Sequence, residues 1–137
     1  MYKFLSHTAD ISFFVEGKTF EELFFYSAMA LKESITKKKI KKITSKKIKL
    51  KEKTLEDLLY SFLEELLFLF EAKFFIFANI EKISIKEKNK EFSLEAEVIG
   101  DNIKEYKISN PVKAITFSEM KIEKIKNKFG TKVVLDV

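Results

Sequence analysis

The sequence predicts an α+β fold in which two helices pack on a mostly antiparallel sheet. Two stretches have the helical spacing of apolar residues, and each begins at a threonine with an acidic residue three positions later. The stretches before, between and after them alternate apolar and polar residues, which is the period of a strand. With 137 residues and no repeat or linker, we expect one domain over residues 1–137.

The first strand is expected over residues 11–16, where Ile11, Phe13 and Val15 alternate with their neighbours. Asp10 stands at the entry to this strand, three residues after His7, the one histidine of the chain. A short polar run at this place is either a simple turn or half of a functional site.

The first helix begins near Thr19, which with Glu22 forms a capping-box pattern. Its apolar stripe consists of Phe20, Leu23, Phe24, Ser27, Ala28, Leu31 and Ile35. Because Phe25, Tyr26 and Met29 lie off this stripe, the helix is apolar nearly all round. We therefore expect it to be covered on more than one side, by the sheet of this chain or by a partner.

The second helix begins at Thr54, and Asp57 completes the same capping signal. One face carries Leu55, Leu58, Leu59, Phe62, Leu63, Leu66, Leu67 and Phe70. We interpret the aromatic residues of both helices as core packing and not as a ligand pocket.

Strand periodicity returns at Ile48 and Leu50 and again from Phe75 onward. The second of these strands changes phase before residue 83, which predicts a β-bulge near residues 78–80. Its partner is expected over 92–98, and the intervening "KEKNKE" is typical of a hairpin connection.

The last third of the chain contains several turn signals. Residues 100–102 break the strand pattern, and Asn110–Pro111 predicts a turn. An extended "VKAITF", a segment "MKIEKI", a turn around residues 127–130 and a final strand "TKVVLDV" follow.

Composition excludes several classes of site. The chain has no cysteine, so disulfides and thiolate chemistry are excluded, and a reducing compartment is favoured. The glycines are too dispersed for a phosphate-binding loop, and no Ser-His-Asp set is recognisable. Because neither a signal peptide nor a transmembrane segment is recognisable, we expect a cytoplasmic protein without membrane contact.

The net charge is +5, from 26 basic and 21 acidic residues. Lysines are densest over residues 37–47, which contain no aromatic residue for base stacking. A solvated loop is the favoured interpretation, but a basic RNA-binding or chaperone-like module that acts through residues 37–47 stays open as the alternative function.

The chain ends in two groups that could hold a metal ion. Asp136 and the α-carboxylate of Val137 lie side by side on a strand whose apolar pattern continues to the end. If Asp10 lay close by, three negative oxygen donors would converge, a set suited to calcium, magnesium or manganese. From residue type and position alone, however, solvated structural residues are the favoured interpretation.

Four blocks of the sequence resemble the archease family in order and spacing. They are "HTADI" near the N-terminus, "EDLLYSFLEELLFLF" in the middle, "VKAITFSEMKIE" later and "VVLDV" at the end. The resemblance implies a non-catalytic protein cofactor of the RtcB-type RNA ligase, which joins tRNA halves in splicing. Such a protein promotes guanylylation of the ligase and its multiple turnover, and it meets tRNA indirectly, through the ligase.

The resemblance also implies a divalent metal site made by Asp10, Asp136 and Val137, with calcium as the first candidate and magnesium or manganese as alternatives. We interpret His7 as a residue that orients the turn holding Asp10, in preference to a direct ligand. A third function, a metal-dependent hydrolase, is disfavoured because no general base is recognisable beside these residues.

One block departs from the family pattern, which commonly has a tyrosine and a histidine where this chain has Phe117 and Ser118. Any role of that tyrosine and histidine is therefore in doubt here. Lys113 and Thr116 are retained as candidate partner contacts, and Glu119 is a candidate replacement charge; exposed strand residues without a function are the alternative.

Overall fold

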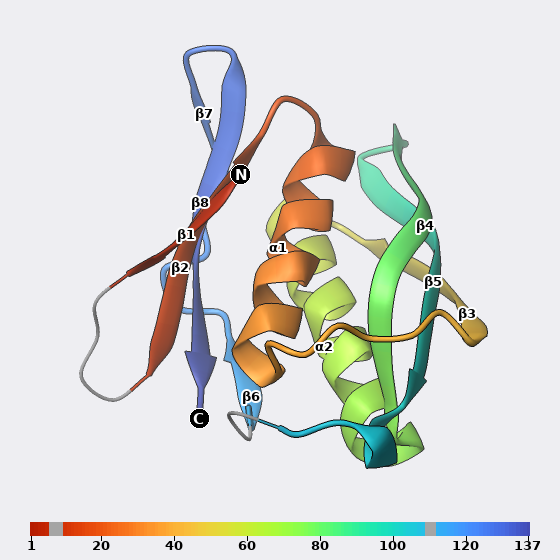
Figure 1. Ribbon diagram of the computed structural model, residues 1–137. Coiled ribbons are helices and arrows are strands. Elements are labelled where there is room, and N and C mark those ends of the chain that lie inside the picture. Colours follow the sequence, from red (N-terminus) through yellow and green to blue (C-terminus); the bar gives the residue numbers. More distant parts are fainter. Residues whose placement is uncertain (6–9, 109–111) are drawn as a thin grey trace.

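The computed structural model describes residues 1–5, 10–108 and 112–137 (Figure 1). The elements in chain order are β1 (Tyr2–Leu5), β2 (Ile11–Gly17), α1 (Phe20–Ile35), β3 (Thr44–Glu52), α2 (Leu55–Lys73), β4 (Phe75–Lys88), β5 (Glu91–Asn102), a 3-10 turn (Ile103–Glu105), β6 (Ala114–Thr116), β7 (Glu123–Ile125) and β8 (Lys128–Asp136). The expected α+β class is confirmed.

The strands form two separate sheets, and the two helices lie between them (Figure 1). One sheet has the order β1-β2-β8-β6, with β7 also paired to β8, and the other has the order β3-β5-β4. All recorded pairings are antiparallel. Because α1 contacts both β2 and β4, the prediction that this helix is covered on more than one side is confirmed.

Both helices begin where the capping signals predict. The Thr19 hydroxyl accepts a hydrogen bond from the backbone N–H of Glu22 at 3.1 Å, and Thr54 does the same for Asp57 at 3.0 Å. Each bond satisfies a backbone donor that has no partner within the helix, a contribution of about 1 kcal/mol to stability.

The core lies between the helices and the two sheets. Phe24 of α1 and Phe62 of α2 are fully buried, and their rings stack 6.0 Å apart. Full burial of one such side chain contributes about 1.5–3 kcal/mol. The interpretation of the stripe aromatics as core residues is therefore confirmed.

The β4–β5 hairpin and its bulge are confirmed, but β5 is longer than predicted. Asn89 and Lys90 both have positive φ, as a two-residue hairpin turn requires, and the register shifts twice between residues 77 and 82. β5 continues through Gly100 to Asn102, where the sequence predicted a break. Gly100 allows close approach of β4: a Cβ there would overlap the Ile76 carbonyl oxygen.

Near the C-terminus the final turn comes earlier than predicted. Lys126, with φ of 59°, lies in the turn between β7 and β8, and β8 already begins at Lys128. Gly130 is therefore a strand residue paired with Glu16, not part of the turn. Of "VKAITF", Ala114–Thr116 is in a strand, and the Asn110–Pro111 turn lies outside the described residues. Among the described helices, none has the length and apolar character to cross a membrane.

Candidate metal centre

Pairing of β2 with β8 brings the beginning and the end of the chain together. Ile11, the first residue of β2, lies opposite Leu135 of β8. Asp10 directly precedes Ile11 in the chain, and Asp136 directly follows Leu135. Two of the three predicted metal ligands are therefore chain neighbours of one cross-strand pair, which brings their backbones into the same region.

The end of β8 is held on both sides. On its other edge β6 pairs Ala114 with Asp136, and the Lys113 N–H donates a hydrogen bond to the Asp136 carbonyl at 2.8 Å. Val137 is half-buried and packs against the core, while the Asp136 side chain is exposed. Val137 thus directly follows a strand end that is paired on both edges.

Ser12 of β2 is a residue near the predicted metal ligands that the sequence analysis did not single out. Its alternation with the core residues Phe13 and Ile11 places it on the same face of β2 as Asp10, opposite Val134. The residue is fully buried, and its Oγ has no hydrogen-bond partner among the described residues. A buried hydroxyl without a hydrogen bond lowers the free energy of unfolding by about 1–3 kcal/mol. This is a reason to expect a further polar group near Ser12.

A hollow of about 410 Å³ adjoins Asp10 on the side of α1. Asp10, Glu33, Ser34 and Lys37 contribute its polar lining. The Glu33 carboxylate accepts a hydrogen bond from the Tyr2 hydroxyl at 3.1 Å. Burial, and after it this hydrogen bond, raises the pKa of Tyr2. Asp10 is half-buried and lies beside this hollow.

These donors fit a hard divalent cation. Carboxylate and hydroxyl oxygens are the ligands that calcium, magnesium and manganese prefer. Among the described residues no group of three or more His, Cys, Asp and Glu side chains is arranged to hold a metal. The predicted contribution of the Val137 α-carboxylate to a metal site stays a prediction.

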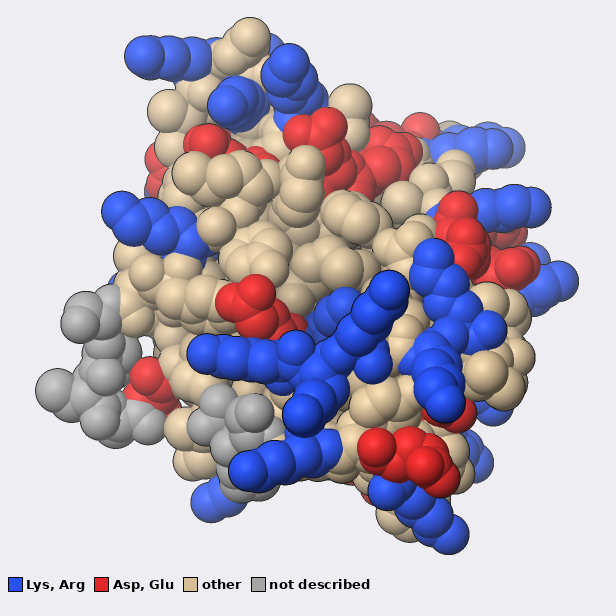
Figure 2. All heavy atoms as spheres, viewed as in Figure 1, with Lys and Arg blue, Asp and Glu red and all other residues tan. Residues whose placement is uncertain are grey.

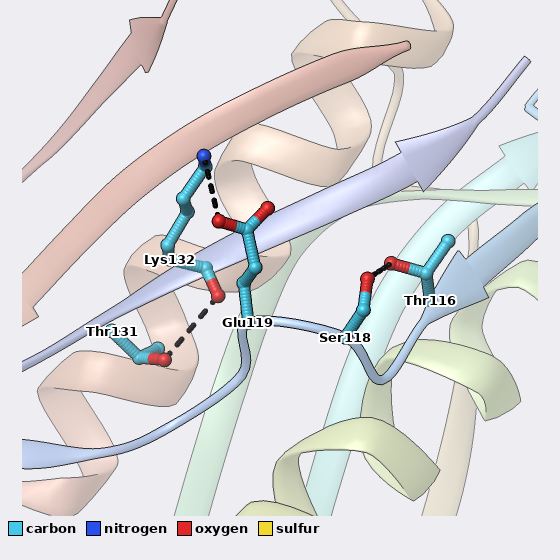
Figure 3. Close-up of polar contacts among 5 residues, drawn as sticks. All are labelled: Thr116, Ser118, Glu119, Thr131 and Lys132. Carbon is cyan, nitrogen blue, oxygen red and sulfur yellow. Dashed lines mark hydrogen bonds and ion pairs between the residues drawn. The ribbon is translucent and has the colours of Figure 1, made fainter.

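The predicted partner contacts do not form one patch of free side chains (Figure 3). Glu119 pairs with Lys132 at 3.2 Å, and the Thr116 hydroxyl lies 3.2 Å from that of Ser118. Lys113 lines a different hollow, between β6 and α2. His7 lies outside the described residues, so its predicted role stays a prediction.

The whole chain is similar to known proteins. The sequence model of the family described as "Archease protein family" matches residues 2–137 of this chain. A protein archease from Methanosarcina barkeri is 37% identical and covers 99% of this chain and 95% of its own length. A protein archease from Pyrococcus furiosus is 37% identical, and the match covers 87% of this chain and 85% of that protein.

Two solved structures share the fold. The solution structure of Methanobacterium thermoautotrophicum protein 1598 has a TM-score of 0.87 and 30% identity, covering 99% of this chain and 98% of its own. The crystal structure of an archease from Thermotoga maritima, described as a possible chaperone, has a TM-score of 0.63 and 25% identity, covering 100% and 98%. By sequence over its full length and by fold, the chain belongs to the archease family.

Proposed function

We propose that this protein holds a divalent cation between Asp10, Asp136 and the α-carboxylate of Val137, and that it activates an RtcB-type RNA ligase in tRNA splicing. Activation would consist of promoting ligase guanylylation and multiple turnover. The observation that supports the metal site is the β2–β8 pairing, which ends at Ile11 and Leu135, the chain neighbours of Asp10 and Asp136. Calcium is the first candidate because oxygen donors on strand ends suit its flexible coordination.

The residues of the chain contribute position and charge. The Lys113 N–H and the pairing with β6 hold the backbone at Asp136. Like charges directly opposed across two strands repel, so the two aspartates and the terminal carboxylate favour a cationic ligand between them. A cation bound there would supply Lewis-acid stabilisation of phosphate oxygens.

We propose a protein as the direct partner, with tRNA reached through the ligase. Membership of the archease family supports this, as does the description of the Thermotoga maritima archease as a possible chaperone. Phe68 and Phe117 are large apolar side chains that stay about half exposed, at 49% and 44%, and exposed apolar residues are common at protein contacts. In this proposal the chain assists the ligase and is not itself the catalyst.

The metal site can be tested apart from activation. Asp10→Asn and Asp136→Asn remove one charge each without changing size, and one alanine added after Val137 converts its carboxylate to an amide. Glu81→Gln, at an exposed position on β4, is the control with the same change in charge. Calcium binding by isothermal titration calorimetry should weaken at least tenfold in the first three variants and stay unchanged in the control.

The second measurement is guanylylation of an RtcB-type ligase with GTP, with and without each variant. The three site variants should lose most of the stimulation, while Glu81→Gln keeps it. Full stimulation by variants that have lost calcium would separate activation from the metal site and refute the proposed mechanism. Calcium binding by all variants alike would refute the site itself.

A further inference from the structure

A groove of about 510 Å³ runs along the side of α1 that neither sheet covers. Its apolar lining comes from Tyr2 of β1 and from Phe25, Tyr26 and Met29 of α1. Each of these side chains is half-buried, and the rings of Phe25 and Tyr26 meet edge to face at 5.5 Å. Each packs partly against the core, and the part of its surface that the core leaves uncovered lines the groove.

Lysines border the same groove. Lys37, Lys38 and Lys39 all line it and are exposed, and Figure 2 shows lysine side chains gathered on this face beside the tan surface over α1. Among the described residues, no ion pair is recorded for them. Their charges are thus free to meet an external anion.

The segment that carries these lysines is held in place. The Thr36 hydroxyl donates to the Lys107 carbonyl at 2.7 Å and accepts from the Lys38 N–H at 3.2 Å. Ile40 is buried in the core, and the Lys41 N–H donates to the Tyr106 hydroxyl at 2.9 Å. The lysines therefore project from an anchored segment, which lowers the entropy lost when they bind a ligand.

The groove adjoins the hollow beside Asp10, because Glu33 and Lys37 line both. Glu33 is the acidic residue of the groove lining, and its carboxylate is engaged by the Tyr2 hydroxyl. Lys32 at the groove floor is also engaged, since its amine donates to the Ala78 carbonyl at 3.2 Å. The groove thus offers aromatic faces on one side and uncommitted positive charge on the other.

We propose that this groove binds single-stranded RNA, with bases against Tyr2, Phe25 and Tyr26 and the phosphates along lysines 37–39. Aromatic faces beside a basic track are how proteins bind unpaired nucleic acid without regard to sequence. An acidic peptide would satisfy the lysines but would leave the aromatic rings without bases to stack on. The function is additional to the metal site and does not depend on it.

The test measures fluorescence anisotropy of an end-labelled 12-nucleotide single-stranded RNA with the full chain. The groove variant combines Lys37→Gln, Lys38→Gln and Lys39→Gln. The control combines Lys82→Gln, Lys86→Gln and Lys88→Gln, the same charge change at exposed positions of β4. Tyr26→Leu removes a stacking ring while keeping apolar area, and melting temperatures verify that each variant is folded.

With three phosphate contacts, log affinity should fall with log salt at a slope of about −2, or about 20-fold between 50 and 200 mM. We expect the groove variant to lose at least tenfold in affinity and most of this slope, while the control stays within twofold. Tyr26→Leu should weaken binding of the single strand about tenfold and leave the slope unchanged.

Equal losses in the two triple variants would show that diffuse charge binds the RNA, and would overturn the proposal. An RNA duplex that binds as tightly as the single strand, or an acidic peptide that binds the groove more tightly than RNA, would overturn it too. So would the absence of RNA binding at 50 mM salt.

Discussion

Replacing Asp136 by asparagine should change protein stability in opposite directions with and without metal. Asp136 is exposed and follows Leu135, whose cross-strand partner Ile11 is preceded by Asp10. The substitution keeps the size of the side chain, so no cavity forms and the change is electrostatic. Without metal, it removes a negative charge from a place where like charges meet.

The magnitudes follow from the geometry and from binding linkage. Two unit charges about 4 Å apart repel by roughly 1 kcal/mol in water, so in EDTA the variant should be more stable by up to about 1 kcal/mol. Calcium at 100 times its dissociation constant should stabilise the wild type by about 2.7 kcal/mol. The variant should gain far less, because it lacks one of its anionic donors.

Thermal unfolding followed by circular dichroism measures both effects. For a chain of this length about 1 kcal/mol corresponds to roughly 4 °C, so calcium should raise the wild-type melting temperature by about 10 °C. The order of stability of the two proteins should then be reversed relative to EDTA. An equal calcium shift in both proteins would refute the assignment of Asp136, and Glu81→Gln serves as the charge-matched control.

Three further outcomes follow from the fold. Gly100→Ala should lower the free energy of unfolding by at least about 1–3 kcal/mol in urea titration, because the new Cβ would lie 2.6 Å from the Phe77 Cα; an unchanged midpoint would contradict the close approach. Thr54→Ala should lower the free energy of unfolding by about 1 kcal/mol in the same assay, because it removes the helix cap. Thr54→Ser should retain most of the stability, because its hydroxyl can still accept the capping hydrogen bond. Burial and, after it, the hydrogen bond to Glu33 raise the pKa of Tyr2 above the ordinary value of 10.0. The stability that the neutral Tyr2 hydroxyl contributes is therefore present below pH 10.0 and is lost as pH rises through the folded pKa. Tyr2→Phe should remove this part of the alkaline loss in unfolding titrations, and identical pH profiles would contradict it.

The two helices and the β4–β5 hairpin could be predicted from local patterns because their signals are local, whereas β1 (Tyr2–Leu5) was not predicted. Thr19 and Thr54 cap helices through bonds to residues three positions away, and the β4–β5 hairpin joins neighbouring strands. Separation of the strands into two sheets depends on long-range packing that periodicity does not encode. Gly100 was misinterpreted for the same reason: a glycine needed for close approach has the same local signal as a turn glycine.

The candidate metal site was only partly predictable. The pairing of Ile11 with Leu135 joins residues at the two extremes of the sequence, and residue spacing does not predict such a contact; it was expected from the family resemblance. Ser12 was missed because a serine on a strand is usually solvated, and its burial arises from tertiary packing. The aromatic groove was missed because lysines 37–39 have no aromatic neighbours in the sequence, whereas the fold places α1 and β1 beside them.

The open sides of the two helices lie beside groups of opposite charge, and this separates the two proposed partners. Each helix has a sheet on either side and the other helix behind it, which leaves one side open (Figure 1). On α1 that side adjoins lysines 37–39, whereas on α2 it carries Glu64, Glu65 and Glu71 beside the hollow that Lys113 lines. An anionic strand is attracted to the first and repelled by the second. RNA bound in the groove therefore leaves the α2 side open to a protein partner. A variant that loses RNA binding should for this reason still be able to contact the protein partner.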